Sequence, residues 1–489
     1  MVNPVLFIVV PLGFAFAIPL LGLISKKIVK FVPIVALLFN LVSAVLIMPS
    51  VLKAPMIVKI GGFPPPFGIN LVVGPVAILF VLLIALAGFL VGLYALAYIK
   101  EGEEVKYHIL YLLLLAGATG VVLTGDLFNL FVFFEILCIS SYALVAYFGN
   151  KSGVESSIKY LIQGSVGTSL FLIGIGLLYG LYGTLNIADL ARQIESVAPV
   201  SAFLPMVLIV TGLGIEAAIF PLNGWLPDAH SSAPSSISAI LSGIAIEVGL
   251  YAVVRVLFTI FGISTIFIVL IFLGVTTLLI GEMCAFSQNN IKRMLAYSSI
   301  GQIGLIVFAM TTATSHAVTG GLFQMVSHTL GKGLLFLAAG YMIVRSGSME
   351  ITSFAGMAKR MPLTSLAFTI GAFSLVGLPP FIGFPGKFLI VQAAIAKETI
   401  LFTVLVSLVL LATVIEGAYF FRVVQAIYFK TGSENTERQE APAAALIPMF
   451  ILAALIVVIG IYPELVTSIL SSAASELLNR MDYIRSILG

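Results

Sequence analysis

The sequence predicts an all-α protein that crosses a membrane about fourteen times, and its composition and patterning support this fold class. Hydrophobic residues make up 60% of the 489 residues and charged residues only 9%, whereas a soluble domain carries about 25% charged residues. The mean hydropathy is +1.18. The apolar segments are continuous runs and lack the ~10-residue alternating pattern of a membrane β-barrel.

Charged or Pro/Gly-rich stretches separate the apolar runs and fix the predicted spans. We expect spans near 4–24, 30–49, 71–99, 107–124, 126–148, 155–182, 201–229, 234–260, 264–286, 291–311, 316–345, 362–395, 400–429 and 443–462. The first run lacks the basic segment of a cleaved signal peptide, so we interpret it as a membrane helix. Residues 463–489 are too polar to span and are expected to form a short amphipathic surface helix.

Basic residues are distributed unevenly between the loops and predict the orientation. Loops after odd-numbered spans hold 15 of them: Lys26, Lys27, Lys30, Lys100, Lys106, Lys151, Lys159, Lys292, Arg293, Arg345, Lys359, Arg360, Arg422, Lys430 and Arg438. The other loops and the tail hold 6: Lys53, Lys59, Arg192, Lys397, Arg480 and Arg485. We therefore expect both termini to lie outside a prokaryotic cell (inner) membrane.

An internal repeat is visible in the two phrases "IEVGLYAVVRVLF" and "IEGAYFFRVVQAIYF". Their glutamates, Glu247 and Glu416, are 169 residues apart, and two further pairs echo this spacing: Lys159 with His328 (169) and Glu216 with Lys387 (171). The spacing predicts an N-terminal part at 1–106, repeats at 107–263 and 264–430, and a last helix with its tail at 431–489. Each repeat holds five spans, so the second copy is inverted, as in many ion-translocating proteins.

Ionisable residues inside the spans are the main functional signal, because each costs at least ~2.5–3.5 kcal/mol at the bilayer centre. The interior set comprises Glu135, Glu216, Glu247, Arg255, Glu282, His328, Lys332, Lys387 and Glu416. Lys159, Asp228, Lys292 and Arg422 lie nearer span ends. Such residues mark ion pairs, water-filled cavities or proton paths.

Two of these residues sit beside proline breaks. Glu216 precedes Pro221 in the seventh span, and a stretch rich in Pro and Gly precedes Lys387 in the twelfth. Proline frees carbonyl groups that need water or polar side chains inside a membrane. Two broken helices at matching places therefore predict a hydrated ion site, and a packed kink is the alternative.

Simpler structural interpretations stay open for several groups. Glu135 could pair with Lys159 instead of carrying protons, and Glu282 is expected to pair with Lys292 or Arg293. Other ionisable groups have alternatives of the same kind. Arg255 and Arg422 could neutralise Glu247 and Glu416. His328 could be a satisfied core residue, although it shares one helix face with Lys332. Asp228 with His230 could form a water entrance or a helix cap.

The sequence contains no signal for a cofactor or nucleic-acid site. The two cysteines, Cys138 and Cys284, lie in apolar runs without a second cysteine nearby and are interpreted as packing thiols. Phosphate-cradling and metalloprotease motifs are absent, and no basic stripe suggests nucleic acid. We expect no cofactor in this chain and no catalytic redox site, which leaves open whether its complex is an enzyme.

Four motifs, "TGDLFNLFVFFEIL", "FPLNGWLPDAHSSAPSSISAILSG", "NNIKRMLAYSSIGQIG" and "SHTLGKGLLFLAAG", give the chain a resemblance to a known family. It resembles the antiporter-like subunits of Mrp-type cation/proton antiporters, especially their D-type member, of membrane-bound hydrogenases and sulfur reductases, and of respiratory complex I. The resemblance implies two half-channels for protons, possible Na⁺ exchange, and other membrane subunits as partners. It assigns the proton path to Glu135, Lys159, His328, Lys332 and Lys387.

Two positions depart from this family pattern, because Glu216 and Glu247 stand where the family usually has lysines. With Glu135 they would place three carboxylates in the first half, an oxygen-rich arrangement that could attract Na⁺. The leading hypothesis is a subunit that translocates protons, with Na⁺/H⁺ exchange as an option. The alternative is a partly non-conducting scaffold, and a stand-alone solute transporter is the third hypothesis.

Overall fold

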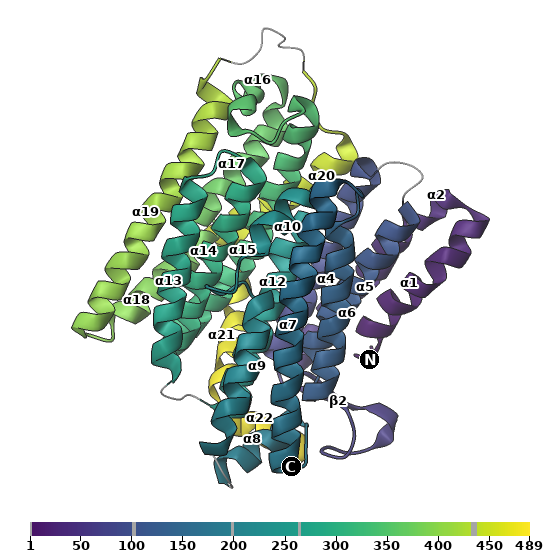
Figure 1. The fold of residues 1–489 in the computed structure, drawn as a ribbon, viewed down its shortest axis with the longest axis vertical. Helices are drawn as coiled ribbons and strands as arrows, with labels where there is room; N and C mark the ends of the chain where they lie inside the picture. The colour runs from purple at the N-terminus through teal and green to yellow at the C-terminus, as the bar shows by residue number, and fades with distance from the viewer. Residues whose placement is uncertain (1, 100–103, 197–199, 263–265, 432–437) are drawn as a thin grey trace.

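The computed structural model describes residues 2–99, 104–196, 200–262, 266–431 and 438–489, which form a bundle of long helices (Figure 1). Lys100, counted above among the basic residues, and the predicted start of the ninth span at residue 264 lie outside the described residues. The helices run between the two ends of the molecule, and a thin hairpin projects from the lower end in this view.

The N-terminal part begins with a helical pair that leans away from the bundle (Figure 1). Its elements are α1 (Leu6–Ile24), α2 (Lys26–Val29), α3 (Val32–Val51), the antiparallel strands β1 (Met56–Lys59) and β2 (Asn70–Val73) joined through η1 (Ile60–Gly62), and α4 (Pro75–Tyr98). Proline at the first position of α4 suits a helix start, because its missing N–H would have no partner there.

The next group contains the first broken helix and two π-helical turns. Its elements are α5 (Glu104–Leu123), α6 (Leu127–Val145), α7 (Lys151–Tyr182), α8 (Ile187–Ser196), η2 (Val200–Ala202), α9 (Phe203–Glu216), α10 (Leu226–Ser232), α11 (Ser235–Ile240), η3 (Leu241–Ala245), α12 (Ile246–Arg255) and η4 (Val256–Phe261). The two π-helical turns, η3 and η4, flank α12, which carries Glu247, and such turns are frequent at functional sites.

The third group contains the second broken helix and is followed by the tail. Its elements are α13 (Ile266–Phe286), α14 (Ile291–Thr312), α15 (Ser315–Ser346), η5 (Ile351–Phe354), α16 (Met357–Arg360), α17 (Pro362–Val376), α18 (Gly383–Ile395) and α19 (Ile400–Phe429). The last helices are α20 (Ala443–Ile461), α21 (Glu464–Leu478) and α22 (Arg480–Leu488).

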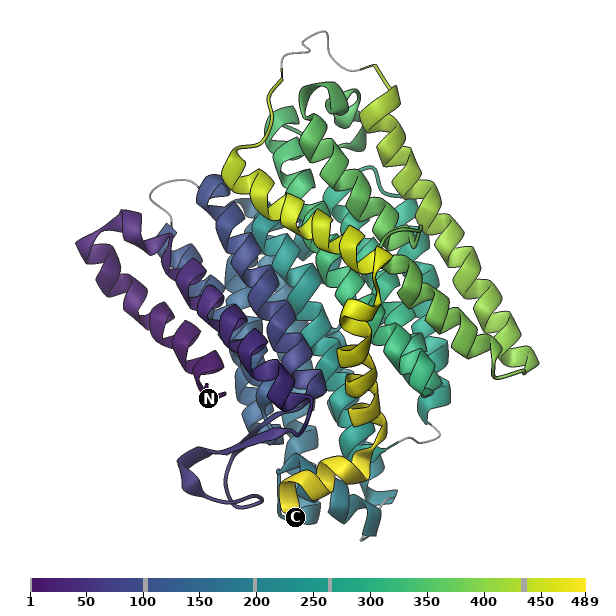
Figure 2. The same ribbon diagram turned by 180° about the vertical axis from the view of Figure 1, so that it is seen from behind.

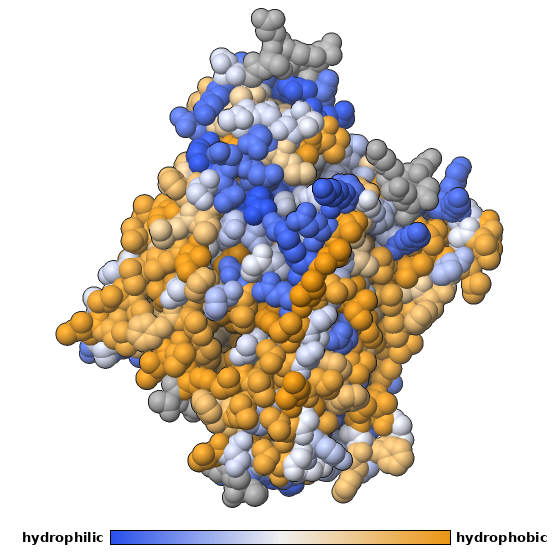
Figure 3. Space-filling view, in the orientation of Figure 1, coloured by the Kyte–Doolittle hydropathy of each residue, from blue (hydrophilic) through white to orange (hydrophobic). Residues whose placement is uncertain are grey.

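These elements confirm the predicted fold class of a polytopic α-helical membrane protein. Within the described residues, 11 helical segments are long and apolar enough to cross a membrane. The remaining three predicted spans are α15, a 32-residue helix that carries His328 and Lys332, and the broken segments α9/α10 and α17/α18. Apolar side chains cover the middle of the molecule, whereas hydrophilic ones gather at its upper end (Figure 3).

The inverted repeat is visible in the helix termini. Asp126 and Asn290 cap α6 and α14, Asn150 and Thr314 cap α7 and α15, and the left-handed glycines Gly183 and Gly347 end α7 and α15. Within each pair the two residues are 164 positions apart, and α7 and α15 are both 32 residues long. Equivalent helices are therefore separated by five spans and run in opposite directions.

This spacing corrects two of the residue pairs inferred from the sequence. At a separation of 164, Lys159 corresponds to Phe323 and not to His328. Glu216 is the last residue before the first break, whereas Lys387 is the fifth residue of α18, after the second break. The two charges thus lie on opposite sides of their breaks. The repeat limits at 107–263 and 264–430 stay a prediction.

The tail is not the surface helix that its polarity suggested. Helix α21 packs against α4 and α15 and buries Leu470, Ala473 and Leu477 (Figure 2). Its carboxylate Glu476 accepts a 2.9 Å hydrogen bond from the buried Arg255 guanidinium and another of 2.9 Å from the Val76 N–H. Because Arg255 pairs with Glu476 and Glu247 contacts His328, the alternative that Arg255 neutralises Glu247 is wrong.

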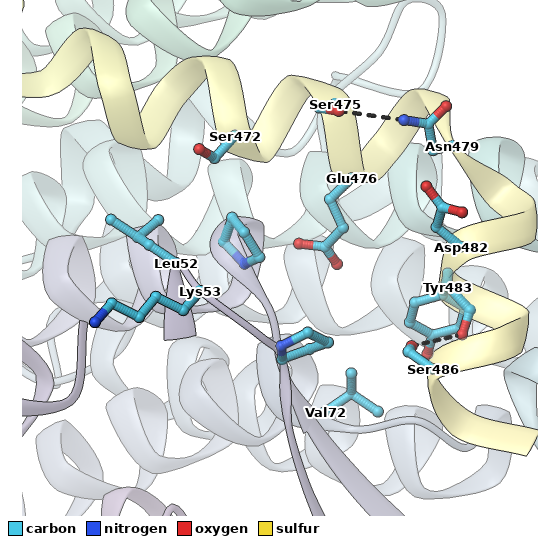
Figure 4. A pocket seen from close by; sticks show the side chains of 12 residues that line it. Leu52, Lys53, Val72, Ser472, Ser475, Glu476, Asn479, Asp482, Tyr483 and Ser486 are labelled. Carbon is cyan, nitrogen blue, oxygen red and sulfur yellow. Dashed lines mark hydrogen bonds between the residues drawn. The ribbon is translucent and has the colours of Figure 1, made fainter. Parts of the chain in front are cut away.

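A cavity of about 400 Å³ lies where the tail meets the N-terminal part (Figure 4). Side chains of α21 and α22, among them Glu476 and Tyr483, form one wall, and Lys53 and Val72 lie on the other. The guanidinium of Arg255 lies 4.2 Å from the ring centre of Tyr483. The ion pair and this stacked ring hold the tail against the bundle.

We expect the Glu476→Ala variant to unfold at a lower temperature than the wild type, because it leaves the buried Arg255 unpaired. Breaking a buried ion pair costs about 3–5 kcal/mol. Thermal unfolding of the purified protein in mild detergent measures the effect. Glu464→Ala removes an exposed carboxylate from the same helix and serves as the control. Equal melting temperatures for the two variants would contradict the assignment.

Candidate functional site

The first break, between α9 and α10, is held by an aromatic pair. The Trp225 indole donates a 2.8 Å hydrogen bond to the carbonyl of Ile215, which also accepts a 3.0 Å bond from the backbone N–H of Ala218. The ring of Tyr160 stacks on Trp225 at 3.7 Å, and its hydroxyl donates to the carboxyl of Glu216. Side chains of neighbouring elements therefore hydrogen-bond to both the backbone and the carboxyl group at this break.

Glu216 is almost fully buried and its hydrogen-bond partners are neutral. Besides Tyr160, the thiol of Cys138 donates to its Oε2 atom at 3.6 Å, so Cys138 is more than the packing thiol that we expected. No lysine, arginine or histidine in the described part of the chain forms an ion pair with Glu216. The family usually has a lysine at position 216, and no other cation in the described part of the chain takes the place of that charge.

Glu135 lies on the other side of Cys138, on the outward face of α6. It is partly buried and interacts electrostatically with Glu216 and Cys138. The predicted alternative of an ion pair with Lys159 is wrong, because Lys159 pairs with Glu155 and Asp228. Within the described ranges, Glu135 makes no hydrogen bond or ion pair.

The junction between the two repeats is a contact between Glu247 and His328. The Nδ1 atom of His328 on α15 lies 2.6 Å from Oε1 of Glu247 on α12, and both side chains are buried. The second oxygen of Glu247 and the Nε2 atom of His328 have no partner among the described residues. Buried polar atoms are normally hydrogen-bonded, so we expect a water molecule or a proton to satisfy these two atoms.

The second break holds an ion pair. Lys387 on α18 donates a 2.5 Å hydrogen bond to Oε2 of Glu416 on α19 and a 3.2 Å bond to the carbonyl of Val376 at the end of α17. The other oxygen of Glu416 accepts from Gln302 at 2.6 Å, and Gln302 in turn accepts from Gln324 at 2.5 Å. Lys387 therefore bonds both to the backbone carbonyl at the break and to the buried carboxylate of Glu416.

Arg422 does not neutralise Glu416, although this was one alternative. Its guanidinium donates to the carbonyl of Gln288 at 2.7 Å and lies 5.7 Å from the ring centre of Phe286. The partner of Glu416 is thus Lys387, from a neighbouring helix.

Lys332 and Glu282 lie between the junction and the second break. Lys332 donates a 3.0 Å hydrogen bond to the Leu295 carbonyl and interacts electrostatically with Glu282 and Glu416. Glu282 accepts a 2.8 Å bond from Tyr419 and has one unpartnered oxygen in the described part. The predicted pairing of Glu282 with Lys292 or Arg293 is wrong.

The partners of those two cations lie near the broken seventh span. Lys292 is buried and donates a 2.5 Å hydrogen bond to the carbonyl of Ala233, which follows α10. Arg293 donates a 2.6 Å hydrogen bond to Asp228 of α10. Both cations thus fasten the start of α14 to the region of α10.

A charged cluster marks the upper end of this region. Asp228 accepts from Arg293 and also from Lys159 at 3.2 Å. The side chain of Lys159 is 52% exposed, so Lys159 belongs to this surface cluster and not to the buried set. Hydrophilic side chains extend from the upper end of the molecule down over the face that carries α10 (Figures 1 and 3).

His230 lies deeper than expected for an entrance residue. Its ring is fully buried, stacks on Phe336 at 5.1 Å, and has no hydrogen-bond partner on either nitrogen in the described part of the chain. It interacts electrostatically with Lys292 and Lys332. His230 thus lies between the surface cluster and the buried ionisable groups.

The predicted cluster of Glu135, Glu216 and Glu247 is not assembled. Glu216 binds Tyr160 and Cys138, Glu247 binds His328, and Glu135 faces outward. No group of three or more His, Cys, Asp or Glu residues in the described ranges could hold a metal ion. The oxygen-rich Na⁺ arrangement inferred from the sequence is therefore not supported.

Several site residues carry no charge, so the pattern of ionisable residues in the sequence did not indicate them. Tyr160, Gln302, Gln324 and Tyr419 each hydrogen-bond to a buried carboxylate or to its amide partner. Glutamine inside an apolar run is a usable signal, because an unpaired amide is costly there. A tyrosine is not, since it also packs well as an apolar ring.

Comparison with known proteins places these features in a family. Residues 124–414 match the family described as the transmembrane part of NADH:quinone oxidoreductase and Mrp antiporters. The N subunit of the NADH-quinone oxidoreductase of Desulforudis audaxviator is 35% identical over 95% of this chain and 97% of its own length. The D subunit of the Na(+)/H(+) antiporter of Bacillus subtilis is 34% identical, over 91% of each chain.

Solved structures show the same fold. A chain of the membrane-bound sulfane sulfur reductase, an archaeal respiratory membrane complex, is 40% identical, with a TM-score of 0.93 over 99% of both chains. A chain of the Mrp complex from Dietzia sp. DQ12-45-1b is 26% identical, again with a TM-score of 0.93 over 99% of both chains. These relatives work inside multisubunit membrane complexes. The chain therefore belongs to the family of antiporter-like membrane subunits shared by Mrp antiporters and NADH:quinone oxidoreductases.

Proposed function

We propose that this subunit moves protons through its second half, along the row of buried ionisable groups that runs from His230 to Lys387. The observation that supports the proposal most strongly is the continuity of the row. His230 and His328 both interact with Lys332, Lys332 interacts with Glu282 and Glu416, and Glu416 holds Lys387. Charged groups are kept inside a membrane chiefly where they pair or serve a transport path.

The pair of Lys387 and Glu416 is the switching element of this path. A proton that reaches Glu416 cancels its charge and weakens the hold on Lys387. Lys332 interacts with both members of the pair, so a change at one site alters the proton affinity of the others. Such coupling moves protons stepwise without a bound cofactor, and we propose none for this chain.

The entry point that we propose is the cluster of Asp228, Lys159 and Arg293. The side chains of this cluster are partly exposed, and His230 is buried with no hydrogen-bond partner on either ring nitrogen among the described residues.

The subunit works in a multisubunit membrane complex, and we propose two types of complex from its relatives. An Mrp-type cation/proton antiporter and a redox-driven pump similar to the sulfane sulfur reductase are both consistent with the comparisons. In a redox-driven pump, electron transfer would take place in partner subunits, and this chain would respond through conformation and charge.

We propose that the first half mainly supports the structure and conducts protons poorly. Glu216 lacks a cationic partner in the described ranges, and no hydrogen bond there joins it to Glu247. Without an opposing charge, an arriving proton has no ion pair to separate. Na⁺/H⁺ exchange is left to the partner subunits in this proposal.

The proposed location is a prokaryotic cell membrane, with both termini outside. The support is the count of 15 basic residues in one set of loops against 6 in the other.

We expect Lys387→Ala to lower proton flux through the reconstituted complex by roughly tenfold or more, because each ~1.4 kcal/mol added to a barrier is tenfold in rate. The variant leaves Glu416 without its counter-charge. Flux is measured with a pH-sensitive dye in proteoliposomes. Lys397→Ala removes an exposed lysine near the end of the same helix and should keep wild-type flux, whereas wild-type flux in Lys387→Ala refutes the switching role.

We expect the variants Glu216→Gln and Glu247→Gln, made singly and together, to show which half of the chain carries protons. If the first half is only a support, Glu216→Gln alone leaves proton flux unchanged, while Glu247→Gln lowers it through the contact with His328. The same proteoliposome assay measures both single variants and the double one. Loss of flux in Glu216→Gln would show that the first half conducts, and Glu464→Gln controls for the loss of an exposed carboxylate.

We expect a cysteine at position 53 to react with a membrane-impermeant maleimide in intact cells, because Lys53 lies on the side proposed to be outside. A cysteine at position 359, where Lys359 is exposed on the opposite side, should react only after cell lysis. Both are made in a Cys284→Ser background. The reverse pattern would invert the orientation.

A further inference from the structure

Two glutamine side chains form a hydrogen-bonded chain that ends on the carboxylate of the second break. Gln324 of α15 donates a 2.5 Å hydrogen bond to the amide oxygen of Gln302 on α14, and Gln302 donates a 2.6 Å hydrogen bond to Oε1 of Glu416 on α19. All three side chains are buried. Both bonds run in the same direction, so an amide donor and not an amide acceptor meets the carboxylate.

Gln324 sets the direction of this chain. A side-chain amide has a donating NH₂ group at one end and an accepting oxygen at the other. The NH₂ group of Gln324 bonds to the oxygen of Gln302, which leaves the NH₂ group of Gln302 for Glu416. If the amide of Gln302 turned over, two NH₂ groups would face one another and its oxygen would face a carboxylate oxygen. Both contacts repel, so Gln324 holds Gln302 in the donating orientation.

The side chain of Gln324 is itself fixed by the helix that carries Lys387. Helices α15 and α18 pack against each other, and Gly386 lies directly before Lys387. A Cβ atom at position 386 would lie 3.1 Å from Oε1 of Gln324 and 3.2 Å from its backbone nitrogen. The absence of a side chain at Gly386 therefore makes room for Gln324 beside α18.

The two oxygens of Glu416 consequently have partners of different kinds. Oε1 accepts from the neutral amide of Gln302, and Oε2 accepts from the ammonium of Lys387. Lys332 interacts with Glu416 electrostatically, but its hydrogen bond goes to the carbonyl of Leu295. A side-chain amide does not titrate, so Gln302 stays a donor whatever the charge of the carboxyl. The lysine, in contrast, has a flexible stem and can move away.

We propose that Gln302, oriented by Gln324, reserves Oε1 of Glu416 and directs the incoming proton to Oε2, the oxygen that holds Lys387. The inference rests on the proposed function, in which Glu416 takes up a proton. An O–H bond then forms at Oε2 as the hydrogen bond from Lys387 is lost, so proton uptake and lysine release are one event. The two glutamines are positioning residues, because neither exchanges the proton.

The amide of Gln302 thereby prevents an unproductive state. If Oε1 were free, a proton would bind there while Lys387 kept its bond to Oε2. The carboxyl would then be neutral with the lysine still in place, and the transfer would stall. Because a purely structural glutamine pair would not control which oxygen is protonated, the position of the proton distinguishes the two roles.

Infrared spectroscopy of the purified complex tests which oxygen carries the proton. In Lys387→Ala the carboxyl of Glu416 has lost its counter-charge and takes up a proton. Its C=O stretch is the band that disappears in Lys387→Ala/Glu416→Gln. With the proton on Oε2, the C=O group is at Oε1 and accepts the amide bond, which lowers its frequency. We expect Lys387→Ala/Gln302→Met to move the band to higher frequency, because methionine donates no hydrogen bond.

Two further variants test the role of Gln324 and control for the substitution. We expect Gln324→Met, in the same Lys387→Ala background, to add a second component at higher frequency, because the amide of Gln302 is then free to turn. Gln392→Met removes an exposed amide from α18 and should leave the band unchanged. A band that Gln302→Met does not move, a single unshifted band in Gln324→Met, or no band that depends on Glu416 overturns the proposal.

Proton flux in proteoliposomes separates this inference from the proposed function. With Lys387 intact, we expect Gln302→Met to lower proton flux about tenfold, the change that ~1.4 kcal/mol on a barrier produces, and Gln392→Met to keep wild-type flux. Loss of flux in Lys387→Ala together with wild-type flux in Gln302→Met refutes the inference alone. Wild-type flux in Lys387→Ala refutes the switching role, whereas the infrared band still reports which oxygen of Glu416 the amide occupies.

Discussion

The interior of this bundle is organised by one constraint: a polar group in the hydrocarbon layer must find its partner inside the protein. The constraint acts on backbone and side chains together. Where α9 stops, the Trp225 indole adds a second hydrogen bond to the carbonyl of Ile215; where α17 stops, Lys387 donates to the carbonyl of Val376 while it pairs with Glu416. The breaks that make room for ionisable groups are thus stabilised by the same groups or by their neighbours.

The two repeats share a backbone plan but differ in their charge. In the second half, a cation and a carboxylate face one another at the break, with Lys332 nearby. In the first half, the corresponding region holds a carboxyl among a phenol, a thiol and a second carboxyl. Because the helix frame is retained, the difference between the halves lies in the electrostatics of a few side chains.

The sequence predicted the spans, both breaks and most of the buried ionisable groups, because apolar runs and prolines are local signals. It failed where partners come from distant segments. Arg255 pairs with Glu476, 221 residues away, and Lys159 pairs with Asp228 at the surface. Similar phrases in the sequence suggested a repeat spacing of 169, whereas the helix caps fix 164 in α6 and α7. Local patterns do not encode which face of a helix meets which neighbour.

The pairing across the repeats has a consequence for biosynthesis. A ribosome completes α12 well before α15 and the tail, so Glu247 and Arg255 leave it before their partners, His328 and Glu476, which follow 81 and 221 residues later. The eighth span therefore reaches the insertion machinery with two ionisable groups that nothing yet satisfies. Its hydrogen bonds to these partners can form only after α15 and α21 have been made, and a nascent chain truncated before Glu476 lacks the carboxylate that pairs with Arg255.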